Sequence, residues 1–196
     1  MDRRSLIKRA GIAGVLAAGV APAVHAQPSV RWRMAASFPK SLDTIFGSGE
    51  KFAQTVRDLS GGKFEVSVHA AGELMPAFGV VDGLQNGTVE MALTAPYYFT
   101  GKDYIFAFGC GVPFGLTARQ MDAWMEHGGG RQLMDEFYAQ YNIRSQSAGN
   151  TGTQMGGWYR KEIKSVADLK GLKMRLGGGL FGDAMAKLGV VSQNMP

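Results

Sequence analysis

An alternation of strand and helix patterns in the first half of the chain constrains the fold more than any other feature. Apolar, β-branched or alternating segments predict three strands, and helical patterns separate them. The expected order is strand 30–38, helix 41–59, strand 63–69, helix 76–85 and strand 89–94. Strands that alternate with helices form a parallel sheet with the helices packed on its faces. The pattern therefore predicts an α/β fold.

The first helix pattern also predicts which of its faces is buried. Ile45, Phe52, Val56 and Leu59 recur at helical spacing, and an apolar stripe of this kind ordinarily faces the core. The helix is expected to end at Ser60-Gly61-Gly62, because glycine readily adopts the left-handed conformation that closes a C-terminus. We expect the stripe to pack against the sheet.

The second half of the chain predicts two helices and then a new set of strands. After a glycine-broken connector at 106–116, the order is helix 117–127 with Thr117 as N-cap, helix 131–141, strand 143–148, polar segment 150–157, strand 171–176, helix 180–188 and a strand beginning in 189–196. We therefore expect a first α/β lobe over residues 27–116. A helical connector and the start of a second, incomplete α/β lobe are expected over residues 117–196.

Residues 1–26 have the layout of an export signal. A basic segment containing Arg3-Arg4 precedes a short apolar run, and Val24-His25-Ala26 is a small-x-small cleavage pattern. The arginine pair is typical of the twin-arginine (Tat) route. The sequence therefore predicts a signal peptide cleaved near Ala26 and a periplasmic location. The apolar run is too short to span a bilayer, and no cysteine follows it to carry a lipid anchor.

The formal net charge of +5 is largely a property of this signal. Removing residues 1–26 takes away four basic residues and one acid, which leaves 17 basic and 15 acidic residues, a net charge of +2. A nearly neutral chain lacks the basic footprint of a nucleic-acid-binding protein. The single cysteine excludes an internal disulfide and a cysteine-based zinc site.

Residues 177–182 match the dinucleotide-binding pattern G-x-G-x-x-G between a strand and a helix. This motif keeps open an exported, nucleotide-dependent oxidoreductase as an alternative function. Catalytic constellations are otherwise thin, because beyond the signal the only histidines are His69 and His127, and no nucleophile motif is present. We therefore expect a binding protein rather than an enzyme.

Three places carry residues suited to binding a small anion. Arg175 ends a predicted strand, where an arginine can donate two N–H groups to a carboxylate, although a surface ion pair would equally explain it. Gln154 and Asn150 lie in a neutral, oxygen-rich segment that suits a hard cation or a polar ligand, or is simply a solvated loop. Tyr98 follows the third strand and lines either a pocket or the core.

Several motifs together resemble the solute-binding proteins of tripartite ATP-independent periplasmic (TRAP) transporters, most closely the branch that binds 2-oxo acids such as pyruvate. These motifs are A-S-F-P-K-S-L-D-T at 36–44, A-G-E-L at 71–74, G-T-V-E-M at 87–91 followed by Tyr97-Tyr98, N-T-G-T-Q-M-G-G-W at 150–158, and G-L-K-M-R at 171–175. They occur in family order behind an export signal. The resemblance implies a type II-like periplasmic binding protein fold, in which two α/β lobes close over a small organic acid.

The resemblance also implies roles for four residues, a bridging cation and a membrane permease. Arg175 would clamp the ligand carboxylate, Gln154 would hold a bridging Na⁺ or Ca²⁺, Tyr98 would contact the ligand, and Asn150 is a weaker match to the ligand site. The receptor would deliver its acid to TRAP membrane permease subunits. Family members are longer, so we expect a C-terminally truncated chain that binds weakly, or a non-functional fragment. The sequence implies no oligomeric state.

Overall fold

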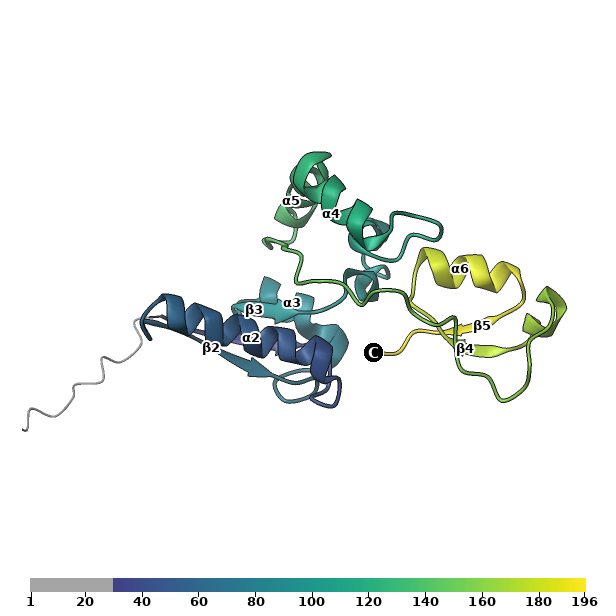
Figure 1. Cartoon of the computed structure of the whole chain (residues 1–196), viewed down its shortest axis with the longest axis horizontal. Helices are drawn as coiled ribbons and strands as arrows, with labels where there is room; N and C mark the ends of the chain where they lie inside the picture. The colour runs from purple at the N-terminus through teal and green to yellow at the C-terminus, as the bar shows by residue number, and fades with distance from the viewer. Residues whose placement is uncertain (1–29) are drawn as a thin grey trace, which may run out of the picture.

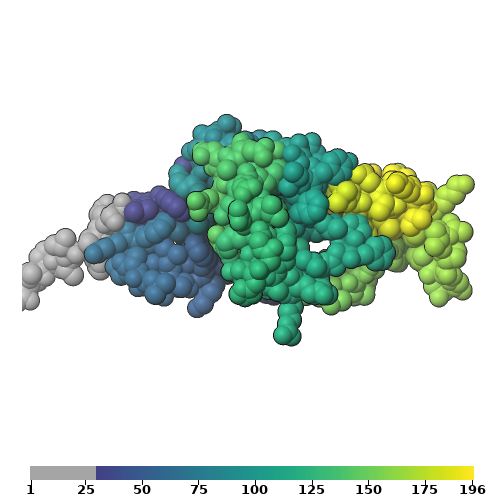
Figure 2. Space-filling view, turned by 90° about the horizontal axis from the view of Figure 1, so that it is seen from above, coloured from purple at the N-terminus to yellow at the C-terminus, as the bar shows by residue number. Residues whose placement is uncertain are grey.

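The computed structural model describes residues 30–196 as two α/β bodies joined by a helical region and extended chain (Figure 1). The export signal predicted over residues 1–26 lies outside the described residues. No helix within residues 30–196 combines the length and the apolar character needed to cross a bilayer. Figure 2 shows the second body, in yellow and yellow-green, at one end of the molecule.

The first body is built on a three-stranded parallel sheet, as the strand–helix alternation predicts. Its strands are β1 (Val30–Ala36), β2 (Phe64–His69) and β3 (Met91–Leu93), arranged in the order β2-β1-β3. Met34 of the central strand pairs with Val68 on one side and Met91 on the other. Of the two neighbours of β1, β2 is the next strand in the chain and β3 is the one after it.

This strand order determines where a ligand site can form. Helix α2 (Asp43–Leu59) connects β1 to β2, and a short 3-10 helix η1 (Ala77–Gly79) continued by α3 (Val80–Gln85) connects β2 to β3. The two crossovers run in opposite directions along the sheet, so right-handed connections place α2 and α3 on opposite faces. The direction of winding reverses at β1, and open α/β sheets bind ligands beyond the carboxyl ends of the strands at such a point.

Helix α2 packs closely on the sheet through a glycine. A Cβ at Gly49 would lie 3.1 Å from both Leu93 Cδ2 and Met34 Sδ, so any larger residue would push these side chains away from the helix. Phe46 is buried beside Gly49. The predicted stripe is therefore partly wrong, because Phe52 and Leu59 are exposed. Phe46 and Gly49 fit against the sheet and therefore determine which face of α2 is buried.

A buried hydroxyl pair joins the segments that follow β1 and β3. Ser37 is 1% exposed, and its Oγ donates to the Ala77 carbonyl at 2.6 Å. The hydroxyl of Thr94 lies 2.6 Å from the same oxygen. Because the single proton of Ser37 is committed to Ala77, Thr94 is the donor in this second bond. These bonds tie together the segments that follow β1, β2 and β3 at the carboxyl edge of the sheet.

An aromatic cluster centred on Phe106 completes the first core. The segments that supply it are the 3-10 helices η2 (Pro96–Phe99) and η3 (Tyr104–Gly109) and helix α5 (Gly130–Ala139). Phe106 is 0% exposed, and the neighbouring rings of Phe99, Phe137, Tyr138 and Tyr141 lie 4.9–5.8 Å from it. Helix α5 thus shares a core with the first sheet, while the division of the chain at residue 116 stays a prediction.

The helical pair confirms the predicted N-cap but not the strand expected after it. Helix α4 (Ala118–His127) begins at Thr117, whose side chain forms a reciprocal capping box with Gln120. The segment 143–148 forms no strand. Ile143 donates its backbone N–H to the Tyr138 carbonyl, and Gln146 accepts from Arg131. These contacts hold the segment along α5, away from any strand with which it could pair.

The second body is a single strand–helix–strand unit. After the short 3-10 helix η4 (Val166–Leu169) come β4 (Lys173–Arg175), α6 (Leu180–Lys187) and β5 (Val191–Gln193), and the two strands are parallel. Met174, Leu176 and Val190 form its own small core. Since Met174 is buried, Lys173 and Arg175 lie on the opposite face of β4. The predicted strands and helix of this region are confirmed.

An ion pair on the first sheet makes the stability of the fold sensitive to acid. Arg33 donates to the Glu90 carboxylate through its side chain at 2.8 Å and its backbone N–H at 2.7 Å. These bonds lower the pKa of Glu90 from its usual value to about 2. A depressed carboxyl pKa stabilises the fold above pH 4.5, and the contribution is lost as the pH falls toward 2.

Glu90→Gln is therefore expected to destabilise the protein at pH 7, and the difference from wild type should shrink to nothing between pH 4.5 and pH 2. Urea unfolding at a series of pH values measures it. Asp122→Asn, which removes an exposed carboxylate of α4, is the control and should track the wild type throughout. A Glu90→Gln difference that is constant with pH would contradict this linkage.

Candidate functional site

The two sheets bring one predicted residue each to a shared site. Tyr98 lies in η2, just beyond the carboxyl end of β3, and Arg175 is the last residue of β4. Nη2 of Arg175 donates to the Tyr98 hydroxyl at 3.3 Å. Carboxyl ends of parallel strands are the usual place for ligands in α/β sheets. Here two such ends, 77 residues apart in the chain, meet in one hydrogen bond.

The chain holds the Arg175 guanidinium while leaving donors available. Its Nε donates to the Met195 carbonyl at 2.9 Å, just after β5. Within residues 30–196 no acidic side chain forms an ion pair with it. An arginine carries five N–H donors, so donors on Nη1 and Nη2 remain for a ligand. The surface ion pair that the sequence left open for Arg175 is not formed.

Tyr98 complements this cation as a neutral hydrogen-bonding group. The residue is 7% exposed. Burial, followed by the neighbouring Tyr97 side chain, raises the pKa of Tyr98 to about 12, and Arg175 only partly opposes the rise. The phenol therefore stays protonated at neutral pH. Its oxygen accepts a hydrogen bond from Arg175.

Aromatic rings surround Tyr98 on the side of the first sheet. The Phe78 ring lies 5.1 Å away and that of Phe38, which follows β1, lies 6.3 Å away. Tyr97 contacts it edge-on at 4.7 Å. These rings give the site an apolar wall beside its cationic clamp. This wall is not predictable from the sequence, because only the strand order places Phe38 next to Tyr98.

Asn150 and Gln154 lie elsewhere, in an exposed loop. Asn150 Oδ1 accepts from the Gly152 N–H at 3.0 Å, and Gln154 Nε2 donates to Thr151 Oγ1 at 2.5 Å. Among the described residues no hydrogen bond joins this loop to Arg175 or Tyr98, and the carbonyl oxygen of Gln154 has no partner. The structure therefore brings Tyr98 and Arg175 together but not Asn150 and Gln154.

The glycine motif at 177–182 packs against protein side chains. A Cβ at Gly177 would meet the Tyr97 ring, and one at Gly179 would meet Thr100. A Cβ at Gly182 would lie 3.0 Å from Ser192 Oγ. These close approaches to protein atoms account for the glycines of the turn, so a bound phosphate group is not needed to explain them. The nucleotide interpretation of this motif loses its structural support.

A basic groove of about 570 Å³ borders Arg175. It is lined by Gly157, Trp158, Tyr159, Arg160, Lys161, Leu172, Lys173, Met174 and Arg175. Four of these residues are cationic. Such a concentration of one charge in a concave surface raises the local concentration of anions.

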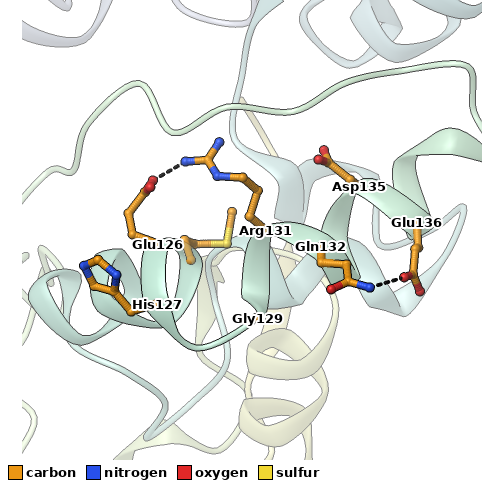
Figure 3. A pocket seen from close by; sticks show the side chains of 8 residues that line it. Glu126, His127, Gly129, Arg131, Gln132, Asp135 and Glu136 are labelled. Atoms are coloured by element: carbon orange, nitrogen blue, oxygen red, sulfur yellow. Dashed lines mark hydrogen bonds and ion pairs between the residues drawn. The ribbon is translucent and has the colours of Figure 1, made fainter.

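A second hollow, of about 460 Å³, lies over α4 and α5 (Figure 3). Glu126, Asp135 and Glu136 line it, and the cation of Arg131 is paired with Glu126. None of the four predicted site residues lines this hollow. Its carboxylates would repel an organic acid, so it is a poor candidate for the site.

Comparison with known proteins gives this geometry a context. The family model described as "Bacterial extracellular solute-binding protein, family 7" (DctP) matches residues 35–196. A protein of Nostoc sp. named monocarboxylate 2-oxoacid-binding periplasmic protein is 47% identical over 203 aligned residues, covering 100% of this chain and 55% of that protein.

Three solved TRAP solute-binding proteins are similar in structure. The Bordetella bronchiseptica protein, with copurified calcium and picolinate, has a TM-score of 0.83 and 50% identity, covering 87% of this chain and 50% of its own. The Pseudoalteromonas atlantica protein, with sodium and pyruvate, has a TM-score of 0.79 and 43% identity, with coverages of 85% and 50%. The Colwellia psychrerythraea protein, with calcium and pyruvate, has a TM-score of 0.79 and 38% identity, with the same coverages.

These similarities confirm the predicted α/β two-lobe fold class and the predicted family resemblance. The family and the relatives named above are solute-binding proteins rather than enzymes. The chain spans about half the length of the relatives it matches.

Proposed function

This chain belongs to the bacterial extracellular solute-binding proteins of family 7, and on that premise we propose that it acts as a periplasmic receptor of a TRAP transporter. In this proposal the twin-arginine signal over residues 1–26 exports the protein. The receptor captures a small organic acid and delivers it to the membrane permease subunits. No covalent chemistry is involved.

The contact between Arg175 and Tyr98 is the observation that carries this proposal. A guanidinium with donors to spare and a neutral phenol O–H converge at one point between two sheets. Both groups donate hydrogen bonds, and a carboxylate accepts up to four. A carboxylate held there would touch both lobes, so its binding would favour their closed arrangement.

We propose a 2-oxo monocarboxylate as the ligand class. Two similar proteins hold pyruvate, and a third holds picolinate, each with sodium or calcium. Pyruvate carries a carbonyl oxygen and picolinate a ring nitrogen on the carbon next to the carboxylate. Either pair of donor atoms closes a five-membered ring on a cation. The shared chemistry is therefore a carboxylate with a second donor on the adjacent carbon.

Gln154 is proposed to supply a protein oxygen to the bridging cation, with Asn150 nearby on the ligand side. The carbonyl oxygen of Gln154 is a neutral oxygen donor of the kind that Na⁺ and Ca²⁺ bind. Among residues 30–196 no three His, Cys, Asp or Glu side chains gather as a metal cluster. Because such cations take about six oxygens or more, the ligand's own chelating atoms would complete part of the shell. When bound, the cation would neutralise and orient the acid.

Paired ligands test this proposal by isothermal titration in a buffer that contains CaCl₂ or NaCl. Pyruvate is expected to bind and propionate, which lacks the second donor, to bind at least roughly tenfold more weakly. Picolinate should likewise exceed its isomer nicotinate. Removing divalent ions with EDTA and replacing Na⁺ by a bulky organic cation should erase both differences. Equal affinity within each pair would contradict a chelated cation, and no binding of any acid would contradict the receptor role.

A further inference from the structure

The triple glycine Gly177–Gly179 lies against the segment that follows β3. A Cβ at Gly177 would lie 3.0 Å from Cε2 of Tyr97. At Gly178 it would lie 3.4 Å from Thr100 Oγ1, and at Gly179 only 2.7 Å from Thr100 Cβ. Separations near 3 Å or below leave no room for a methyl group. The turn after β4 therefore rests directly on the segment after β3.

The surface that receives the turn is itself fixed. Thr100 is 6% exposed, and its hydroxyl donates to the Tyr97 carbonyl at 3.1 Å. The Tyr97 ring packs edge-on against Tyr98 at 4.7 Å. On another side a Cβ at Gly111 would lie 3.3 Å from Tyr97 Cβ. A side chain so confined cannot move aside freely when the turn carries a larger residue.

This contact runs alongside the clamp. Arg175 meets Tyr98, Gly177 meets Tyr97 and Gly179 meets Thr100, so residues 175–179 lie along residues 97–100. Farther along, the Tyr104 hydroxyl donates to Asp183 of α6 at 2.9 Å, in the same alignment. A displacement of the turn would therefore shift the end of β4 that carries Arg175 relative to Tyr98.

We propose that the Gly177–Gly179 turn, seated on Tyr97 and Thr100, sets the distance between the Arg175 guanidinium and the Tyr98 hydroxyl. These are positioning residues, since they touch the clamp and not the ligand. The glycines are required because their missing side chains bring the two carboxyl strand ends within hydrogen-bonding reach. Only the affinity readout of this proposal rests on the proposed function.

Gly177→Ala tests it, because Gly177 has no positive φ and its new methyl group meets only the Tyr97 ring. Gly101→Ala is the matched control, since no heavy atom lies within 4 Å of a Cβ there. The first readout needs no ligand: nuclear Overhauser contacts between the Arg175 Hδ and Tyr98 ring protons. The second readout is pyruvate affinity with Ca²⁺. Gly177→Ala should lose the contacts and bind roughly tenfold more weakly, while Gly101→Ala keeps both.

A double-mutant cycle separates positioning from general damage. Removing the ring with Tyr97→Ala relieves the crowding, so Gly177→Ala should cost less affinity in that background than in the wild type. Additive losses, or a Gly177→Ala variant that behaves like Gly101→Ala, would overturn the proposal. If Gly177→Ala does not fold, Gly178→Ala repeats the test with crowding against the ends of two side chains, Asn194 Nδ2 at 3.0 Å and Thr100 Oγ1 at 3.4 Å, instead of an aromatic ring. If the wild type binds no acid, the proposed function fails, and the proton contacts still decide the positioning role.

Discussion

Arg175→Ala is expected to weaken the binding of pyruvate by at least roughly 100-fold, because charge-assisted hydrogen bonds to a carboxylate are worth about 1.5–3 kcal/mol each and two are lost together. The substitution should leave folding nearly intact, since Arg175 is exposed and its only described bonds run to Met195 and Tyr98. Isothermal titration measures the affinity. Thermal unfolding with the ligand gives an independent measure, because a ligand that binds only the folded state raises the midpoint.

Two further variants show whether the effect belongs to the clamp. Arg175→Lys keeps the charge but cannot present two parallel donors, so its affinity should fall between those of the alanine variant and the wild type. Arg119→Ala removes an exposed cation of α4 without touching the site, and should bind pyruvate like the wild type. If Arg119→Ala and Arg175→Ala weakened pyruvate binding equally, Arg175 would act through its charge alone and not through directed hydrogen bonds to the ligand.

Phe106→Ala is expected to bring the fold close to unfolding. The side chain is 0% exposed and touches four aromatic rings. Truncating a buried phenylalanine to alanine costs about 3–5 kcal/mol, from lost burial and from the cavity that remains. Whole domains are stable by only about 5–15 kcal/mol. The free energy of unfolding, measured in urea, should fall by that amount with little change in its denaturant dependence.

Phe108→Ala provides the matched comparison, in the same short helix η3. Phe108 is 49% exposed, and surface substitutions usually change stability by about 0.5 kcal/mol or less. Its unfolding curve should nearly overlay that of the wild type. If both variants lost the same stability, burial around Phe106 would not be what holds the helical region to the first sheet.

The fold of the first lobe was largely predictable because its patterns are local. Alternation over residues 63–69 and the glycine stops after each helix mark elements that form where expected. The buried face of α2 was not predictable in the same way. Gly49 is buried because Leu93 and Met34 lie opposite it, and neither is near it in sequence. The strand predicted at 143–148 does not form for a related reason. A strand needs a neighbouring strand to pair with, and the local sequence pattern does not show whether one lies beside it.

The site was predictable residue by residue but not as an arrangement. Arg175 and Tyr98 were named from strand ends and family motifs, and the structure joins them. The Met195 carbonyl that anchors Arg175, and the Phe38 and Phe78 rings beside Tyr98, carry no sequence signal of their own. They follow from the order of strands in the sheet. Roles for Gln154 and Asn150 stay predictions, because the contacts that would join them to the clamp are absent from the described residues.

The aromatic cluster around Phe106 cannot be completed until residue 141 has been synthesised. Phe106 is covered by Phe137, Tyr138 and Tyr141, which the ribosome adds later. At the ordinary rate of about 5–20 residues per second, extending the chain from residue 106 to residue 141 takes roughly 2–7 s. Because residue 141 also leaves the ribosome later than residue 106 by that interval, the emerged first lobe lacks the rings that cover Phe106 and leaves an apolar face open until then. Holding chaperones have that interval in which to engage it before the chain seals its own core.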